Sequence, residues 1–254
     1  MEASQQGNWR EYLQKRVLVI FFLGFSAGLP FALVYSTLTA WLETADVERS
    51  TISTFAWLGF AYSFKFVWAP IIDSTRLPLL SGLLGRRRSW MLLAQVCIGL
   101  ALFILSQVNP AQNIEVFAIA AFAVAFSSAT QDIVVDAYRI EAVEESLQAL
   151  MASTYIAGYR IGMLVAGAVA LYLAAGFGST LETYRYDAWK WTYLCMAATM
   201  LVGVVTTCII SEPVTRGVAS YFHGTLDYVR FLLLFVIFIV VFVAVFVVLS
   251  NTVP

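Results

Sequence analysis

The sequence predicts an all-α integral membrane protein, and three observations support this fold class. The 254 residues are 61% hydrophobic and only 12% charged, whereas a soluble domain is about 45–50% apolar and about 25% charged. The mean hydropathy is correspondingly high, at +0.81. The apolar residues also occur in runs of roughly 20, the length that a helix needs to cross a hydrocarbon core about 30 Å thick.

Seven apolar segments are predicted to span the membrane. Six of them form one unit over residues 17–210, at about 17–41, 51–72, 89–107, 115–138, 147–177 and 188–210. Residues 1–16 are expected to be a cytoplasmic N-terminus. Residues 211–230 are expected to be a cytoplasmic connector, broken at Pro213. The seventh segment, 231–250, is almost wholly Phe, Val, Leu and Ile, so it suits lipid contact or anchoring rather than the lining of an aqueous cavity.

The distribution of positive charge predicts the orientation. Lys and Arg in short connections concentrate on the cytoplasmic side of a membrane. With the N-terminus in the cytoplasm, that side receives Arg10, Lys15, Arg16, Arg76, Arg86, Arg87, Arg88, Arg139, Arg216 and Arg230, and the other side receives Arg49, Arg185 and Lys190. We therefore expect the N-terminus in the cytoplasm.

Several function classes find no support in the composition. The net charge of −1 creates no field that would recruit nucleic acid. The three cysteines (Cys97, Cys195 and Cys208) lie in apolar runs with no metal or redox spacing, and His223 is the single histidine. We expect no metal and no cofactor. The absence of a nucleophile–base set or a phosphate loop argues against an enzyme.

Four charged residues fall inside the predicted spans, where charge is costly and needs an explanation. Lys65 lies in the second span, Asp132 and Asp136 lie in the fourth, and Arg160 lies in the fifth. Two cations and two anions form a balanced set, as expected if they face one another across the interior of a bundle. Gln131 adds polar surface beside the aspartates, which share a helix face because they are four residues apart.

Two interpretations of the aspartates remain open. In the functional one, a carboxylate in an apolar environment binds substrate and exchanges protons near neutral pH. In the structural one, the carboxylates only pair with Arg139 or with the arginines at 86–88. We favour the functional interpretation for Asp132, which lies deeper, and the structural one for Asp136. Arg160 can serve either purpose, because it can simply neutralise an aspartate.

Two further patterns concern helix ends and helix contacts. Asp73, followed by Gly85 and the three arginines Arg86, Arg87 and Arg88, can lock two helices together at the cytoplasmic surface, with Arg139 nearby. Small residues four apart let helices approach closely in a membrane. This spacing occurs at Gly24 and Gly28, followed by Pro30, which can bend the first span, and again at Gly158 and Gly162.

These residues stand in segments that together resemble one family. The segments are FLGFSAGLP at 22–30, YSFKFVWAP at 62–70 followed by Asp73, LGRRR at 84–88, ATQDIVVDAYR at 129–139 and GYR at 158–160. In this order they resemble the AmpG family of muropeptide permeases, a branch of the major facilitator superfamily that also resembles eukaryotic acetyl-CoA transporters. The resemblance covers about residues 15–213.

The resemblance implies a function and its site residues. It implies proton-driven import of anhydromuropeptides, the disaccharide-peptides of peptidoglycan turnover, through the bacterial inner membrane into the cytoplasm. Such import serves peptidoglycan recycling and β-lactamase induction. The pathway would include Lys65 as a partner for a substrate carboxylate, Asp132 for a proton, and Tyr159. The stretch at Asp73 and 85–88 resembles the cytoplasmic gating motif of the superfamily.

Members of this superfamily carry two six-helix halves with the substrate between them, and the residues here match the first half. We therefore expect a second copy of the chain or a separate second-half chain as partner, besides lipid, protons and a small glycopeptide. The alternatives are a truncated or degenerate protein that does not transport, and a transporter half of the same fold with another substrate, either acetyl-CoA-like or exported as a drug.

Overall fold

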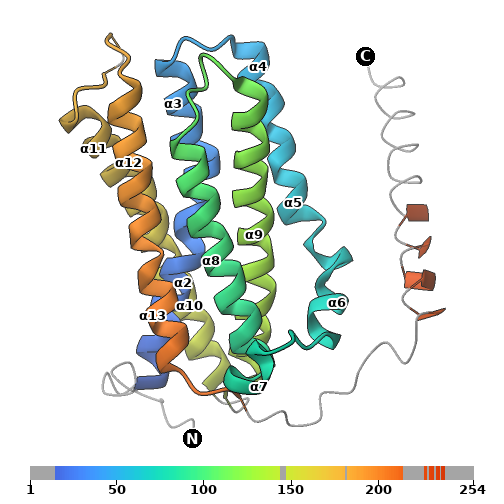
Figure 1. The fold of residues 1–254 in the computed structure, drawn as a ribbon. Helices are drawn as coiled ribbons and strands as arrows, with labels where there is room; N and C mark the ends of the chain where they lie inside the picture. The colour runs from blue at the N-terminus through green and yellow to red at the C-terminus, as the bar shows by residue number, and fades with distance from the viewer. Residues whose placement is uncertain are drawn as a thin grey trace, which may run out of the picture.

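A computed structural model describes residues 15–143, 147–180 and 182–213, with single positions between 226 and 237. The secondary structure of this part of the chain is helical, and no strand occurs in it (Figure 1). Residues 1–14 of the predicted N-terminus, residues 214–225 of the predicted connector and most of the predicted seventh span lie outside the described residues.

Five helices are long and apolar enough to cross a membrane, and they coincide with five of the six spans predicted for residues 17–210. Two of them contain a π-helical turn, in which the helix widens locally. The first of the five helices consists of α2 (Lys15–Ala32), η1 (Leu33–Thr37) and α3 (Leu38–Thr44). The second is α8 (Arg86–Ser106) and the third is α9 (Ile114–Glu141). The fourth consists of α10 (Gln148–Leu164), η5 (Val165–Val169) and α11 (Ala170–Gly176), and the fifth of α12 (Tyr186–Thr199) and α13 (Leu201–Ile209). The chain is thus a multi-pass membrane protein.

The segment predicted as the second span is not one continuous helix. It consists of α4 (Arg49–Thr54), η2 (Phe55–Leu58), α5 (Gly59–Ser63), η3 (Lys65–Val67) and α6 (Ala69–Ser74), which follow one another along α9 (Figure 1). The helix is interrupted at Phe64 and Trp68, whose φ angles are −96° and −103°. Pro70, in the first turn of α6, contributes to the second break because proline disfavours helical geometry in the residue before it and lacks a backbone N–H. A short helix, α7 (Leu80–Leu84), then leads into α8.

Glycines hold α2 and α10 in close contact. A Cβ atom added at Gly24 or Gly28 would overlap a backbone carbonyl of α10, and one added at Gly158 or Gly162 would overlap a carbonyl of α2. The packing role predicted for these four glycines is therefore present in the structure. Pro30 lies inside α2, shortly before the π-helical turn η1.

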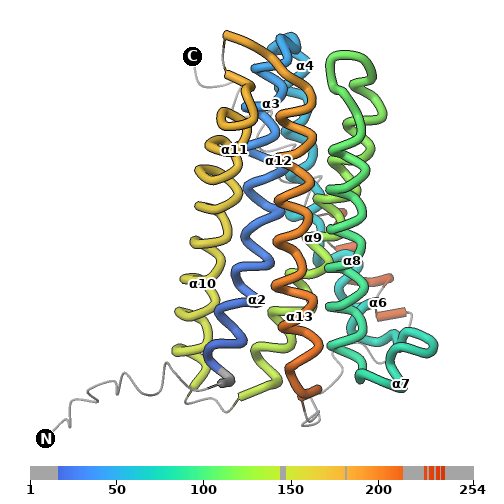
Figure 2. The backbone as a smooth tube through the Cα atoms, turned by 60° about the vertical axis from the view of Figure 1, so that its left-hand side comes forward, coloured from blue at the N-terminus to red at the C-terminus, as the bar shows by residue number. Residues whose placement is uncertain are grey.

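The remaining helices pack around this pair. α2 lies between α10 and α13, as the side view shows (Figure 2), and α8 packs against α9, α12 and α13. At the α3 end of the bundle the core is aromatic: the rings of Trp41 and Trp189 stack at 5.6 Å, and Phe117 meets Trp41 edge-on at 5.0 Å. The broken segment 49–74 packs against α9.

Candidate functional site

Three of the four charged residues predicted to face one another lie together in the structure. The Nζ atom of Lys65, in η3, is 3.8 Å from a carboxylate oxygen of Asp132 and 3.8 Å from one of Asp136. Asp136 also lies 3.6 Å from an Nη atom of Arg139, one helical turn further along α9. Lys65 directly follows the interruption of the helix at Phe64.

Asp132 is the most buried member of this charged cluster, which comprises Lys65, Asp132, Asp136 and Arg139. Its side chain is 10% exposed, whereas the Asp136 side chain is 42% exposed. The Oδ1 atom of Asp132 has no hydrogen-bond partner among the described residues. The carboxylate lies nine residues before the end of α9, which is about 14 Å of helix rise. Among the described residues its charge partner is Lys65, which it shares with Asp136.

Arg160 does not join the charged cluster, contrary to the expectation from the sequence. Its side chain is exposed, and its Nη1 atom lies 3.9 Å from the sulfur of Met163 on its own helix. The neighbouring Tyr159 does point into the bundle, where its ring lies 6.1 Å from that of Phe31. Of the two candidates on α10, Tyr159 thus faces the side on which α2 lies.

Gln131 lies in a separate buried polar cluster on the other side of α9. Its Nε2 atom donates to the hydroxyl of Ser26 in α2 at 3.2 Å. On α8, Gln95 accepts a hydrogen bond from Thr207 of α13 at 2.9 Å. A Cβ added at Gly203 would contact both Ser26 and Gln95. These buried polar groups link α9 to α2 and α8 to α13, so the hydrogen bond of Gln131 is to α2 and not to the charged cluster.

A second charged network lies at the α7 end of the bundle and centres on Arg87, which is 6% exposed. Its Nη1 atom pairs with the carboxylate of Asp73 at the end of α6. Its Nε and Nη2 atoms donate to Glu141, at 3.1 Å to Oε2 and 2.5 Å to Oε1. Arg86 donates to the backbone carbonyl of Asp73 at 2.5 Å. The predicted pairing of Asp73 with the arginines is present, and Glu141 is an additional partner that the sequence did not indicate.

Glu212 completes this network by closing the first turn of α8. Its two carboxylate oxygens accept the backbone N–H groups of Arg87 at 2.7 Å and Arg88 at 3.0 Å. An acidic group at a helix N-terminus satisfies free N–H groups and complements the helix dipole. Gly85 precedes this turn with φ of +88°, a conformation that favours glycine, and its α-carbon faces the Glu212 side chain.

The guanidinium of Arg88 in turn closes the end of α13, with bonds to the carbonyls of Thr207 at 3.1 Å and Cys208 at 2.9 Å. The network therefore joins α6, α8, α9 and α13. Arg139 pairs with Asp136, the pairing that the structural interpretation of this aspartate includes, and lies 5.7 Å from the centre of the Tyr155 ring.

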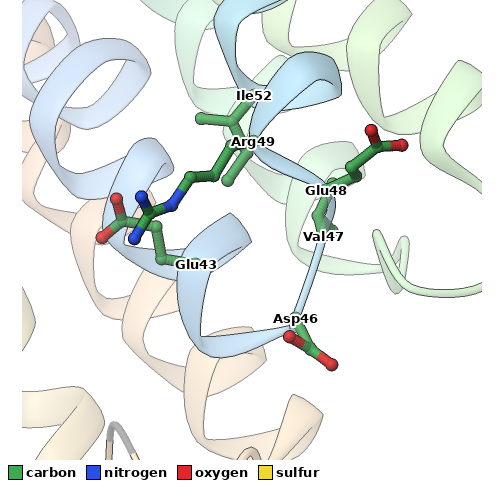
Figure 3. Close-up of a pocket in the computed structure, with 6 residues that line it drawn as sticks. All are labelled: Glu43, Asp46, Val47, Glu48, Arg49 and Ile52. Atoms are coloured by element: carbon green, nitrogen blue, oxygen red, sulfur yellow. The ribbon is translucent and has the colours of Figure 1, made fainter.

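A pocket at the opposite end of the bundle is unrelated to these charges. It lies at the turn between α3 and α4, where the Arg49 side chain extends towards Glu43 (Figure 3). Asp46, Glu48 and two apolar side chains complete its lining. Its position at a connecting turn, away from Lys65 and Asp132, makes it no part of a path through the helices.

Comparisons with known proteins identify relatives of this chain. The family model for acetyl-coenzyme A transporter 1 matches residues 16–186. The chain is 34% identical over 197 residues to putative transporter AmpG 4 of Rickettsia conorii, an alignment that covers 78% of this chain and 45% of the relative. It is also 34% identical over 204 residues to the anhydromuropeptide permease of Escherichia coli strain K12, covering 80% of this chain and 39% of the permease. The chain thus spans less than half the length of these relatives.

Proposed function

Because this chain belongs to the family of acetyl-coenzyme A transporter 1 and the AmpG-type permeases, we propose that it forms one half of a proton-coupled transporter for anhydromuropeptides. In this proposal residues 17–210 are the N-terminal half of a major facilitator superfamily transporter, and cargo moves through the bacterial inner membrane into the cytoplasm. The observation that carries the proposal is the single ammonium of Lys65 placed equally far from two carboxylates.

The shared ammonium couples a proton to an anionic substrate. While both aspartates are ionised, Lys65 is held between them. A proton that binds Asp132 removes one of these attractions and frees Lys65 to pair with a carboxylate of the substrate. A substrate carboxylate at Lys65 in turn favours the protonated form of Asp132, because like charges repel. Proton and substrate then enter together, as symport requires.

The charges on this surface favour a glycopeptide over a coenzyme A thioester. A muropeptide carries carboxylates and amino groups on its peptide, and the charged cluster offers partners of both signs. Coenzyme A carries several phosphate charges, for which the cluster offers only Lys65 and Arg139, both already paired with carboxylates. The Escherichia coli relative is named as an anhydromuropeptide permease, which supports a glycopeptide substrate.

The network around Arg87 is proposed as the cytoplasmic gate. It ties α6 to α8, α9 and α13 through charged side chains, so its opening would let these helices separate at that end. Substrate in this superfamily binds between two halves, and we propose that a second copy of the chain or a separate second-half chain covers the face that carries Lys65. The molar mass of the purified complex distinguishes these two partners.

Uptake of labelled anhydromuropeptide into proteoliposomes tests the proposal. We expect Asp132→Asn to abolish uptake driven by a proton gradient, because the amide cannot carry the proton. Asp136→Asn is expected to have a smaller effect, since Asp136 is more exposed and already pairs with Arg139. The matched control is Asp187→Asn, which removes the same charge from an exposed position in the first turn of α12. Gradient-driven uptake that survives both Asp132→Asn and Asp136→Asn would contradict the mechanism.

A further inference from the structure

Five aromatic rings gather beside the charged cluster. Phe31 and Tyr35 come from α2 and η1, Tyr62 comes from α5, and Tyr155 and Tyr159 come from α10. Phe31 is the centre of the group, with its ring 4.7 Å from Tyr35, 5.2 Å from Tyr62 and 6.1 Å from Tyr159. The rings are tilted or edge-on to one another rather than stacked.

The aromatic group adjoins the charged cluster directly. Tyr155 links the two, since its ring lies 6.0 Å from that of Tyr159 and receives the guanidinium of Arg139 on its face. Tyr62 and Lys65 stand three residues apart on the same segment. The rings and the charges therefore form one continuous surface across α2, the segment 49–74, α9 and α10.

Packing alone does not account for these rings. The aromatic core at the α3 end, with Trp41, Trp189 and Tyr193, is fully buried, whereas Phe31, Tyr35 and Tyr159 are each partly exposed. The Tyr35 hydroxyl is seated close to Gly59, where an added Cβ would lie 3.1 Å from it. Glycine at position 59 therefore leaves room for this tyrosine.

Such a surface matches the chemistry of a sugar. One face of a pyranose ring presents C–H groups, which pack on an aromatic ring, while its rim presents hydroxyl and amide groups, which bond to tyrosine hydroxyls. We propose that Phe31, Tyr35 and Tyr159 form the subsite that binds the sugar rings of the glycopeptide, with the charged cluster holding its peptide. This inference rests on the proposed function and divides the substrate between two neighbouring surfaces.

Binding of substrate fragments to the purified chain in detergent tests this division. The probes are the anhydro-disaccharide without peptide, the free stem peptide and coenzyme A. We expect Tyr35→Leu and Tyr159→Leu each to weaken disaccharide binding about three- to tenfold, the range for loss of one aromatic contact, and to leave peptide binding unchanged. Lys65→Met is expected to weaken peptide binding and spare the disaccharide. The matched control is Tyr172→Leu, an exposed tyrosine on α11.

Saturation-transfer NMR on the unmodified chain gives a second measurement that does not depend on how well a variant folds. Irradiation of aromatic protons should transfer saturation to the sugar-ring protons of the glycopeptide more strongly than to the methyl protons of its peptide. The reverse pattern would overturn the subsite, as would unchanged disaccharide affinity in both leucine variants, or binding of coenzyme A without the disaccharide.

The outcomes separate this inference from the proposed function. If proton-driven uptake depends on Asp132 but the leucine variants bind disaccharide as the parent chain does, the sugar subsite is wrong and the transport mechanism stands. If the leucine variants lose disaccharide affinity while Asp132→Asn retains full gradient-driven uptake, the subsite stands and the proton mechanism is wrong.

Discussion

Glu141→Gln is predicted to destabilise the α7 end of the bundle more than any change at Asp73. The Glu141 side chain is 7% exposed and accepts hydrogen bonds from two nitrogens of Arg87, which is itself buried. Asp73 contacts the same guanidinium but is 48% exposed. The two partners of Arg87 thus differ in burial, and burial determines how much each pairing contributes to the stability of the fold.

The magnitudes follow from that difference. Removal of one partner from a buried ion pair costs about 3–5 kcal/mol. Glutamine keeps the shape and one acceptor oxygen, so the loss is closer to that of one charge-assisted hydrogen bond, about 1.5–3 kcal/mol. Because Asp73 is half exposed, solvent screening leaves Asp73→Asn a cost of about 0.2–1 kcal/mol. For a chain of this size 1 kcal/mol shifts the melting temperature by about 2–4 °C. Glu141→Gln should therefore lower it by about 3–12 °C and Asp73→Asn by less than about 4 °C.

Thermal unfolding of the purified variants in detergent measures both values. The matched control is Glu115→Gln, which makes the same substitution in the exposed first turn of the same helix, where the helix dipole makes a carboxylate worth up to about 1 kcal/mol. If Asp73→Asn lowered the melting temperature as much as Glu141→Gln, the assignment of Glu141 as the principal partner of Arg87 would be refuted.

Four further substitutions test the packing of the bundle by the same melting experiment, one of them also by hydrogen exchange. Gly28→Ala should cost at least about 2 kcal/mol because a Cβ there overlaps a carbonyl of α10, whereas Gly99→Ala, with no atom within 4 Å, should gain up to about 1 kcal/mol of helix propensity; equal effects would exclude the close helix contact. Glu212→Ala should cost about 1–2 kcal/mol by freeing two N–H groups in the first turn of α8, and a neutral result would remove its capping role. Thr37→Val should cost about 1 kcal/mol and speed hydrogen exchange in η1, because it removes a buried 2.6 Å bond to the facing π-helical turn; unchanged exchange would show that this bond does not hold the two turns together.

The sequence predicts the helical fold and the pairing of Lys65 with the aspartates because both follow from the cost of polar groups in lipid. Apolar runs locate five helices to within a few residues. A lysine and two carboxylates inside such runs have few ways to be stabilised other than by meeting one another. The interruption of the second segment at Phe64 carries no comparable signal, since only Pro70 marks a break in its sequence.

Arg160 shows how helix phase limits a prediction made from residue type alone. Each residue turns an α-helix by about 100°, so Arg160 lies about 200° from both Gly158 and Gly162. Those glycines contact α2, which places Arg160 on the opposite side of α10. The glycine spacing in the sequence therefore already contained the correction. The same geometry separates Gln131 from Asp132, which follow one another on α9 and face different neighbours.

Glu141 and Glu212 could not be found in this way. They lie far in sequence from Arg87, by 54 and 125 residues. Glu141 ends α9 and Glu212 lies three residues beyond α13, positions where an acidic residue commonly faces water. Their contacts depend on how α9 and α13 are positioned beside α8. Such positions follow from the packing of the whole bundle rather than from any local pattern.

The exposure of the charged cluster indicates what must lie against it. Lys65 and Asp136 are 34% and 42% exposed, and Asp136 lies five residues, about 8 Å of helix rise, from the end of α9. A charge facing lipid at the centre of a span costs about 2.5–3.5 kcal/mol or more, and charged residues inside spans almost always face a bundle interior or a water-filled cavity. Lipid contact is therefore unfavourable for the surface formed by η3 and α9, whereas contact with water in a cavity or with a polar protein surface is favourable. We infer that this face adjoins an aqueous path. The adjoining rings of Phe31, Tyr35 and Tyr159 then need no lipid contact to explain their exposure.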